Sequence, residues 1–202
     1  VTLVALLAVV FFVPGDKSPG NQSAQRLLVP GISEQINNVE RVEIVTASNQ
    51  VLATLLKSGK GWQLEQMSGY RADWSKLRDM LAAVAQARVI ETKTDKPEYY
   101  SRLGVEDISA EDAQSVLVKL SAGDQTTAVL VGRRAEGRTG QYVRMQNEKT
   151  SFLVDRNIEV PTALLSWADS SIVDINASEV AEVEVIHPDG ERVLVTRISA
   201  DQ

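Results

Sequence analysis

The sequence predicts an α+β fold in which a mostly antiparallel β-sheet carries one long helix and two short ones. Three observations favour this fold class. Many short segments alternate apolar and polar residues, which is the period-2 pattern of half-buried strands. One segment places its apolar residues at helical spacing instead. Polar turns follow several strands closely, and this favours antiparallel hairpins over long crossover connections.

The main domain, residues 27–176, opens with a predicted β-hairpin. Its strands lie within residues 38–45 and 51–55, and a third strand begins at Trp62. The period then changes to that of a helix, with Asp73 as its N-cap because a carboxylate can accept the free N–H groups of the first turn. The apolar stripe of this long helix consists of Trp74, Leu77, Leu81, Val84 and the stem of Arg88.

Shorter elements complete the domain. Pro97 is predicted to open a brief helix that Gly104 closes, and Pro161 to open a last short helix that carries Leu164, Leu165 and Trp167. The remaining predicted strands are Val89–Ile90, Ser115–Leu120, Thr126–Val131, Gln141–Met145 and Ser151–Val154.

Residues 177–202 are predicted to begin a second copy of the same unit. Val183 and Val185 alternate with charged neighbours as Val42 and Ile44 do, and a turn and a second short strand follow in both places. We therefore predict a hairpin-led internal repeat of about 140 residues whose second copy is truncated. Chance similarity between two hairpins is the alternative.

The N-terminal segment, residues 1–13, is almost entirely apolar, with Thr2 as its one polar side chain. A membrane-spanning helix needs about 20 apolar residues, so we interpret this segment as a truncated single-pass anchor. A signal segment and a buried core segment are the alternatives. Residues 14–26 are rich in Pro, Gly, Ser, Asn and Gln and predict a flexible linker.

The composition is that of a folding globular chain and excludes several kinds of site. The 202 residues are 44% hydrophobic and 24% charged, and 21 Lys and Arg against 27 Asp and Glu give a formal charge of −6. The absence of Cys excludes disulfides and thiolate chemistry, and the single histidine, His187, excludes His-rich zinc sites. An acidic chain without a sustained basic run is a poor nucleic-acid binder. We therefore predict no cofactor, no metal site and no nucleic-acid partner.

One glycine-rich segment has the spacing of a phosphate-binding loop. In Gly132–Thr139 an arginine, Arg138, stands where the lysine of such a loop belongs, and a strand pattern follows where a helix is needed. We interpret this segment as a hairpin loop. Its arginines, with one on the next strand, are candidate contacts for an anionic partner or lipid headgroups, and a solvated loop is the alternative. These candidates are Arg133, Arg134, Arg138 and Arg144.

We assign no catalytic residues, but two other functions stay open. An envelope hydrolase would use paired carboxylates from an acidic cluster at Glu106, Asp107, Glu111 and Asp112. A structural or glycan-binding envelope module would present an exposed aromatic platform from Trp62, Tyr70 or Trp167. His187 precedes a proline in a turn, and we interpret it as a surface residue.

Several stretches occur in an order and spacing that resemble a bacterial envelope family. They are Leu27–Gly31, Gly61–Leu64, Gly69–Asp73, Lys93–Thr94, Pro97–Tyr100, Leu103–Val105, Val131–Gly132, Tyr142–Arg144 and Trp167. The series resembles the family called domain of unknown function 4340 over residues 27–175. No catalytic residues are assigned to that family, so the resemblance supplies none.

The resemblance implies a membrane-anchored protein of the bacterial inner membrane whose domain faces the periplasm. Genes of the family often neighbour ABC-2-type transporters, including systems that resemble gliding-motility transporters. Together with the apolar N-terminus, this predicts a non-enzymatic accessory or substrate-contacting component of an ABC-type transport system. The expected partners are the membrane and an ABC-type permease or another envelope protein.

Overall fold

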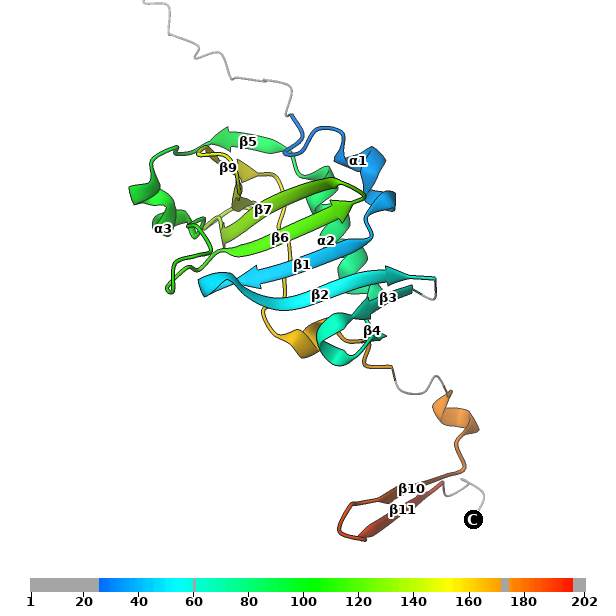
Figure 1. Cartoon of the computed structure of the whole chain (residues 1–202). Helices are drawn as coiled ribbons and strands as arrows, with labels where there is room; N and C mark the ends of the chain where they lie inside the picture. The colour runs from blue at the N-terminus through cyan, green and yellow to red at the C-terminus, as the bar shows by residue number, and fades with distance from the viewer. Residues whose placement is uncertain (1–25, 60, 172–174, 198–202) are drawn as a thin grey trace, which may run out of the picture.

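A single antiparallel sheet forms the body of the protein in the computed structural model, which describes residues 26–59, 61–171 and 175–197. Nine strands lie in the order β4-β3-β2-β1-β6-β7-β8-β9-β5, and every neighbouring pair is antiparallel (Figure 1). The predicted fold class, mostly antiparallel β with a few short helices, is confirmed. The predicted anchor at residues 1–13 lies outside the described residues, and no helix within them is both long and apolar enough to cross a bilayer.

The first half of the sheet is a meander of four strands. The strands are β1 (Arg41–Thr46), β2 (Gln50–Ser58), β3 (Gly61–Leu64) and β4 (Tyr70–Arg71), with the 3₁₀ helices η2 (Ala47–Asn49) and η3 (Glu65–Met67) between them. Val42 and Ile44 are fully buried and alternate with the half-buried Arg41 and Glu43, as their period predicts. Val45, next to Ile44, is buried as well. The short edge strand β4 was not predicted.

The second half contains the other five strands, with β5 at the far edge. They are β5 (Val89–Thr92), β6 (Val116–Ala122), β7 (Gln125–Arg134), β8 (Gln141–Met145) and β9 (Ser151–Val154). All five confirm predicted strands, and β5 and β7 are longer than predicted. The two halves join where β1 pairs with β6, from Arg41 opposite Ser121 to Val45 opposite Leu117.

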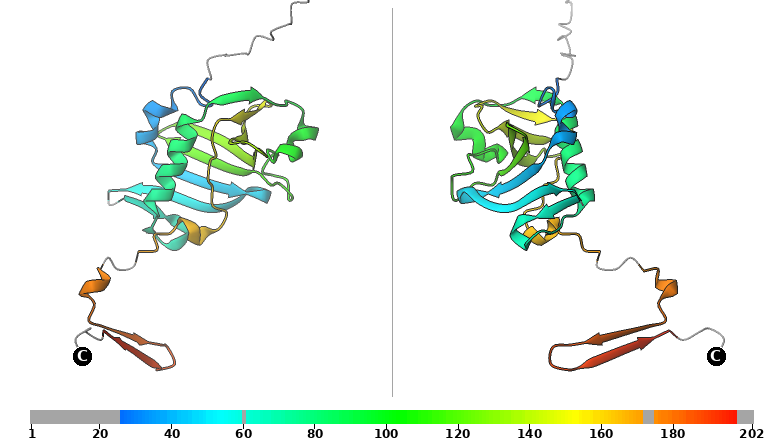
Figure 2. Two further views of the ribbon diagram at one scale, coloured as in Figure 1. Left: turned by 180° about the vertical axis from the view of Figure 1, so that it is seen from behind. Right: turned by 45° about the vertical axis from the view of Figure 1, so that its right-hand side comes forward.

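One face of the sheet is covered by α2 (Trp74–Gln86), as the view from behind and the view turned by 45° show (Figure 2). Asp73 caps this helix, because its side chain accepts hydrogen bonds from the backbone N–H groups of Ser75 and Lys76. The buried stripe of Leu77, Leu81 and Val84 packs into the main core, as predicted.

Two details of the helix prediction are wrong. Trp74 is 51% exposed rather than buried. Helical side chains lean toward the N-terminus, so a residue in the first turn covers surface beyond the start of the helix and not the sheet below it. Arg88 lies two residues past the end of α2 at Gln86 and does not belong to the stripe.

The opposite face is covered only over its second half. The covering segment contains η4 (Pro97–Tyr99) and α3 (Tyr100–Leu103), which Gly104 ends in the left-handed conformation, as predicted. Ile108 from this segment packs with Leu117 and Leu130 in a small second core. Over β1 the same face carries charged side chains instead, with Arg41 bonded to Glu43.

Short helical turns mark both ends of the domain. Before β1 lie α1 (Ile32–Gln35) and η1 (Ile36–Asn38), neither of which was predicted. After β9 the chain crosses the α2 face to η5 (Leu164–Trp167), which begins three residues later than the predicted start at Pro161. The Trp167 indole donates a hydrogen bond to the Pro161 carbonyl, and residues 161–163 before η5 are not helical.

The C-terminal residues form a separate two-stranded sheet. It consists of β10 (Glu182–Ile186) and β11 (Arg192–Thr196), preceded by η6 (Ala177–Glu179). The predicted strand–turn–strand is therefore present. Every residue of both strands is exposed.

Candidate functional site

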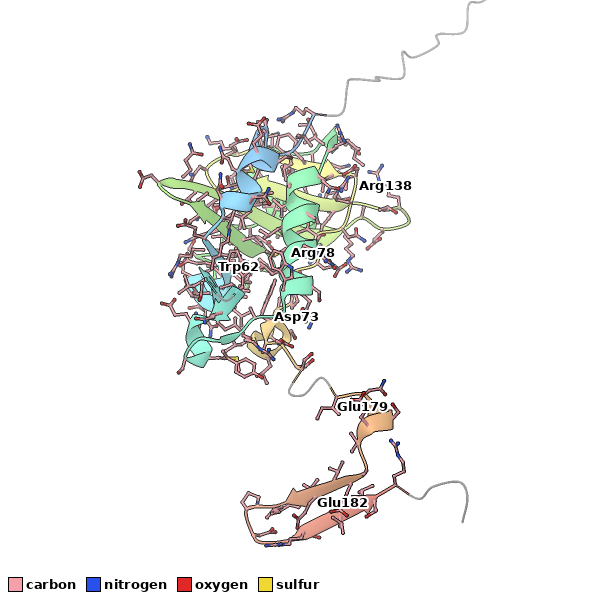
Figure 3. All side chains as sticks on the ribbon, turned by 90° about the vertical axis from the view of Figure 1, so that its right-hand side faces the viewer. Trp62, Asp73, Arg78, Arg138, Glu179 and Glu182 are labelled. Carbon is pink, nitrogen blue, oxygen red and sulfur yellow. The ribbon has the colours of Figure 1, made fainter. Side chains whose placement is uncertain are left out.

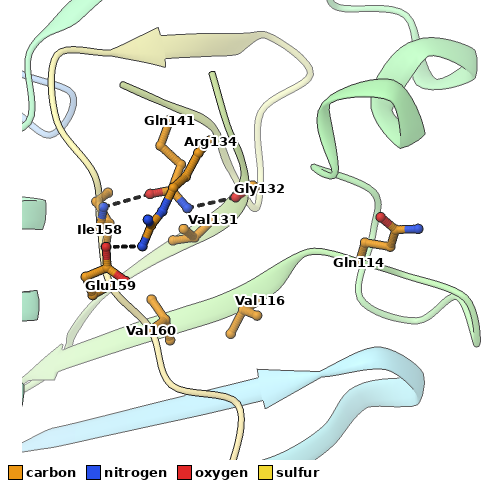
Figure 4. Close-up of a pocket in the computed structure, with 9 residues that line it drawn as sticks. All are labelled: Gln114, Val116, Val131, Gly132, Arg134, Gln141, Ile158, Glu159 and Val160. Atoms are coloured by element: carbon orange, nitrogen blue, oxygen red, sulfur yellow. Dashed lines mark hydrogen bonds and ion pairs between the residues drawn. The ribbon is translucent and has the colours of Figure 1, made fainter. Parts of the chain in front are cut away.

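A pocket of about 270 Å³ lies beside the loop that joins β7 to β8 (Figure 4). Val116 on β6 and Val131 on β7 form part of its floor, and the segment after β9 closes it with Ile158, Glu159 and Val160. The remaining lining side chains are polar and come from Gln114, Arg134 and Gln141. The pocket therefore combines an apolar floor with a polar rim at the edge of the main core.

Gln141 fixes the shape of this pocket. It is buried, and its amide nitrogen donates to the Gly132 carbonyl at 2.8 Å while its amide oxygen accepts from the Ile158 N–H at 2.7 Å. The register of β7 against β8 shifts between Val131 and Arg134, so one carbonyl of the ladder is free to meet a side chain. Gln141 thereby ties the shifted strand to the segment after β9.

Gly132 allows α3 to approach β7 from the other face. A Cβ at this position would lie 2.5 Å from the Leu103 carbonyl oxygen and 2.7 Å from that of Gly104. Both neighbours are backbone atoms and cannot rotate away, so only glycine fits. The glycine that resembled part of a phosphate-binding loop in the sequence thus has a packing role within a strand. After β7, the backbone N–H of Ala135 bonds to the Gly140 carbonyl, which confirms the predicted hairpin loop.

Three of the four predicted contact arginines are exposed and bonded to other side chains of the domain. Arg133 donates to the side-chain oxygen of Gln114, Arg134 forms an ion pair with Glu159, and Arg138 forms one with Glu91 at 2.9 Å. Figure 3 shows Arg138 at the outer edge of the molecule, away from the first turn of α2. Hydrogen bonds from Lys93 and then Arg138 hold the pKa of Glu91 below its usual value.

The fourth predicted arginine, Arg144, is buried and not part of this exposed group. Its guanidinium donates to the carbonyls of Val105 and Glu148 and to the Asp107 carboxylate, the last at 2.6 Å. The charge also lies 4.4 Å from the centre of the Tyr100 ring. Arg144 therefore holds the segment that carries α3 against β8, because its side chain points to that face of the sheet.

The acidic cluster proposed for a hydrolase is spread along one loop. Asp107 is bound to Arg144, whereas Glu111 and Asp112 are exposed. The Oε2 atom of Glu106 is buried without a hydrogen-bond partner, and within the described ranges Asn157 has the only other such side-chain atom. Nowhere in residues 26–59, 61–171 and 175–197 do three or more His, Cys, Asp or Glu side chains gather to hold a metal ion. The hydrolase function stays a prediction.

The aromatic side chains divide between the core and the surface. Trp167 and Trp62 are buried, whereas Tyr70 is exposed. Trp74 is exposed too, and so is Leu165 on η5. The backbone N–H of Asp73 bonds to the Trp167 carbonyl, so the start of α2 and η5 are neighbours at this end of the domain. Of the three predicted platform residues, Tyr70 is exposed and Trp62 and Trp167 are buried, so the glycan-binding module stays a prediction.

The fold and this site define an antiparallel sheet domain with a small polar-rimmed pocket and exposed arginines beside it. The chain belongs to the family described as Domain of unknown function (DUF4340), whose model matches residues 62–202. The match starts at β3, later than the resemblance at residues 27–175, and it includes the C-terminal hairpin. Comparison with curated proteins and with solved structures gave no significant match.

Proposed function

We propose that this protein is a non-catalytic contact subunit, tethered to the bacterial inner membrane by residues 1–13, with its domain in the periplasm. It would act as an accessory or substrate-contacting component of an ABC-type transport complex. The association with such a complex rests on the resemblance of the sequence to a family that often neighbours these transporters. Membership of that family supports the proposal.

The observation that carries the proposal is the exposure of Arg134 and Arg138 beside the pocket. Their side chains are 58% and 51% exposed, and the carboxylates paired with them, Glu159 and Glu91, are 68% and 46% exposed. Exposed ion pairs contribute about 0–1 kcal/mol to stability. An acidic partner can therefore replace Glu159 and Glu91 at little cost to the fold.

The position of these arginines suits a partner in the membrane. The backbone N–H of Val89 donates to the carbonyl of Arg26, so the chain enters the domain beside the first residue of β5. Arg138 bonds to Glu91, two residues further along the same strand, which is about 7 Å away. A tether that joins the domain at Arg26 would keep this edge near the bilayer, where acidic loops of a permease would meet it.

Co-purification of the full-length protein in mild detergent tests this proposal. We expect a transporter permease or ATPase to accompany it, and Arg134→Glu with Arg138→Glu to reduce the recovered partner several-fold. The control is Arg192→Glu, because Arg192 is also exposed and paired with a carboxylate, Glu184. Recovery of no transporter component, or equal losses in both variants, would contradict the proposal.

A second assay separates a protein partner from lipid headgroups. The same variants are mixed with vesicles of anionic lipid, and bound protein is measured by flotation. If charge reversal at Arg134 and Arg138 abolishes vesicle binding but leaves co-purification unchanged, the arginines serve the membrane surface and not the permease.

A further inference from the structure

The C-terminal hairpin has one face made of valine. Val183 pairs with Val195 and Val185 with Val193, so these four side chains lie on the same side of the two strands. We call them the valine face. The other side carries Glu184 opposite Leu194, together with the ion pair between Glu184 and Arg192. The valine face therefore has the apolar composition of a strand face that is buried in a core.

The first hairpin of the main domain has the same arrangement. Val42 pairs with Leu55 and Ile44 with Ala53, which matches the valine pairs one for one. A 3₁₀ helix precedes each hairpin, η1 in the first and η6 in the second. The corresponding positions lie about 140 residues apart throughout.

The two hairpins also end on the same backbone contact. The N–H of Lys57 donates to the Glu40 carbonyl at 2.8 Å, and the N–H of Arg197 donates to the Ala181 carbonyl at 2.9 Å. Each bond joins the residue just before the outermost pair of the hairpin, on the first strand side, to the residue just after that pair, on the second strand side. The two hairpins therefore agree in the register of their pairs, in the 3₁₀ helix before them and in the closing hydrogen bond. A similar sequence pattern alone does not require this agreement.

The difference lies in what covers the apolar face. In the first hairpin all four apolar side chains are fully buried, in one core with Leu77, Leu81 and Val84 of α2. The four valines of the second hairpin are between 42% and 59% exposed. An isolated two-stranded hairpin is at best marginally stable in water, so this face gains its stability from whatever covers it.

We infer that the valine face is the docking surface for an amphipathic helix of the α2 type, and that β10–β11 is the first hairpin of a second unit of this fold. Two five-residue strands cover roughly 17 Å by 10 Å, which is about the footprint of three helical turns. The same area falls far below the roughly 800 Å² per partner that a stable protein interface buries. A helix therefore fits this face better than a second copy of the hairpin does.

Hydrogen exchange on an extended chain tests the inference. A copy of residues 58–87, which includes α2, is joined directly after Arg197, the position equivalent to Lys57. We expect the amides of β10 and β11 to exchange at least ten-fold more slowly in the extended chain than in the original one. If the amides of β10 and β11 exchange at the same rate in both chains, the inference is overturned.

Matched substitutions show whether protection depends on the valine face. Val195→Asp is expected to remove the added protection, whereas Leu194→Asp is expected to keep it. The two residues are neighbours, each 59% exposed, and point to opposite sides. Equal effects of the two substitutions would overturn the inference. So would protection in the original chain that appears together with a doubled molecular mass, because the occupant would then be a second copy.

Discussion

At the scale of single residues, Arg144 is an arginine whose tertiary contacts, and not its charge on the surface, determine its role. We expect Arg144→Ala to lower the free energy of unfolding by about 2–4 kcal/mol, because it leaves the Val105 and Glu148 carbonyls without their donor. Arg144→Lys should recover only part of this loss, since an ammonium group cannot reach three acceptors in a planar fork. Urea unfolding measures both.

Arg133→Ala is the control for Arg144. Arg133 is exposed, and among the described residues its guanidinium bonds to the Gln114 side chain alone, so its removal should change the free energy of unfolding by no more than about 0.5 kcal/mol. A loss at Arg144 no larger than this would mean that the buried contacts contribute little net stability.

Gly132 provides the second test at this scale. In Gly132→Ala the new methyl group meets two backbone carbonyls of α3, so we expect a loss of about 1–3 kcal/mol in the free energy of unfolding. Gly59→Ala is the matched control, because nothing lies within 4 Å of the added Cβ there. Thermal unfolding of the two variants compares them, and equal melting temperatures would contradict this account of Gly132.

The sequence could identify the arginines and glycines but not which of them would be buried. Arg144 lies in an alternating strand, which assigns it to a face, yet its acceptors Val105 and Asp107 are nearly 40 positions away in the chain. The role of Gln141 was not predictable for the same reason. A polar residue in a strand gives no local sign that a shifted ladder and a distant loop will satisfy its amide.

At the scale of elements, the cap of α2 makes a prediction that depends on pH. A hydrogen bond from Ser75, helped by bonds from Lys76, lowers the pKa of Asp73 to about 2. Because the carboxylate is the form that caps, its contribution is complete above the unfolded pKa near 4 and is lost as the pH falls toward 2. We expect Asp73→Ala to cost about 1 kcal/mol at pH 7 and much less at pH 2.

The control for the cap is Asp79→Ala on the exposed side of the same helix. Asp79 forms an ion pair with its neighbour Arg78, and both side chains are mostly exposed. Its loss should be small at either pH. Circular dichroism during urea unfolding at pH 7 and pH 2 measures both variants, and a pH-independent loss at Asp73 would show that the charge is not involved.

Most elements could be predicted because their signals are local. The alternation of Val42 and Ile44, the N-cap at Asp73 and the glycine that closes α3 each depend on a few adjacent residues. The two-residue strand β4 and the displaced start of η5 depend instead on tertiary contacts. Tyr70 and Arg71 become a strand because Leu64 and Gln63 lie opposite them.

At the scale of the whole molecule, the shifted groups predict a plateau of stability between about pH 5 and pH 9. Glu91 has a lowered pKa because Lys93 and Arg138 bond to it, so its contribution is lost as the pH falls. Burial raises the pKa of Tyr100, so its contribution is present below pH 10 and is lost as the pH rises further. Melting temperatures across the pH range test this, and Tyr100→Phe should weaken the alkaline decline.

The order of strands in the sheet was not predictable from the sequence. Hairpins such as β6–β7 follow from short turns, but β1 beside β6 and β5 beside β9 join residues far apart in the chain. Such pairings depend on how complete meanders pack under α2. A local pattern carries no information about that choice.

The seam between β1 and β6 has a consequence for how this protein reaches its native state. The meanders β1–β4 and β6–β9 can each form hairpin by hairpin, but the seam brings together residues such as Val45 and Leu117 only after the intervening chain has formed a long closed loop. Topologies dominated by such distant pairings fold slowly, on millisecond to second timescales. A chain that crosses a membrane unfolded would thus expose open strand edges until β1 pairs with β6. Chaperones would have the most exposed edge to protect during this interval.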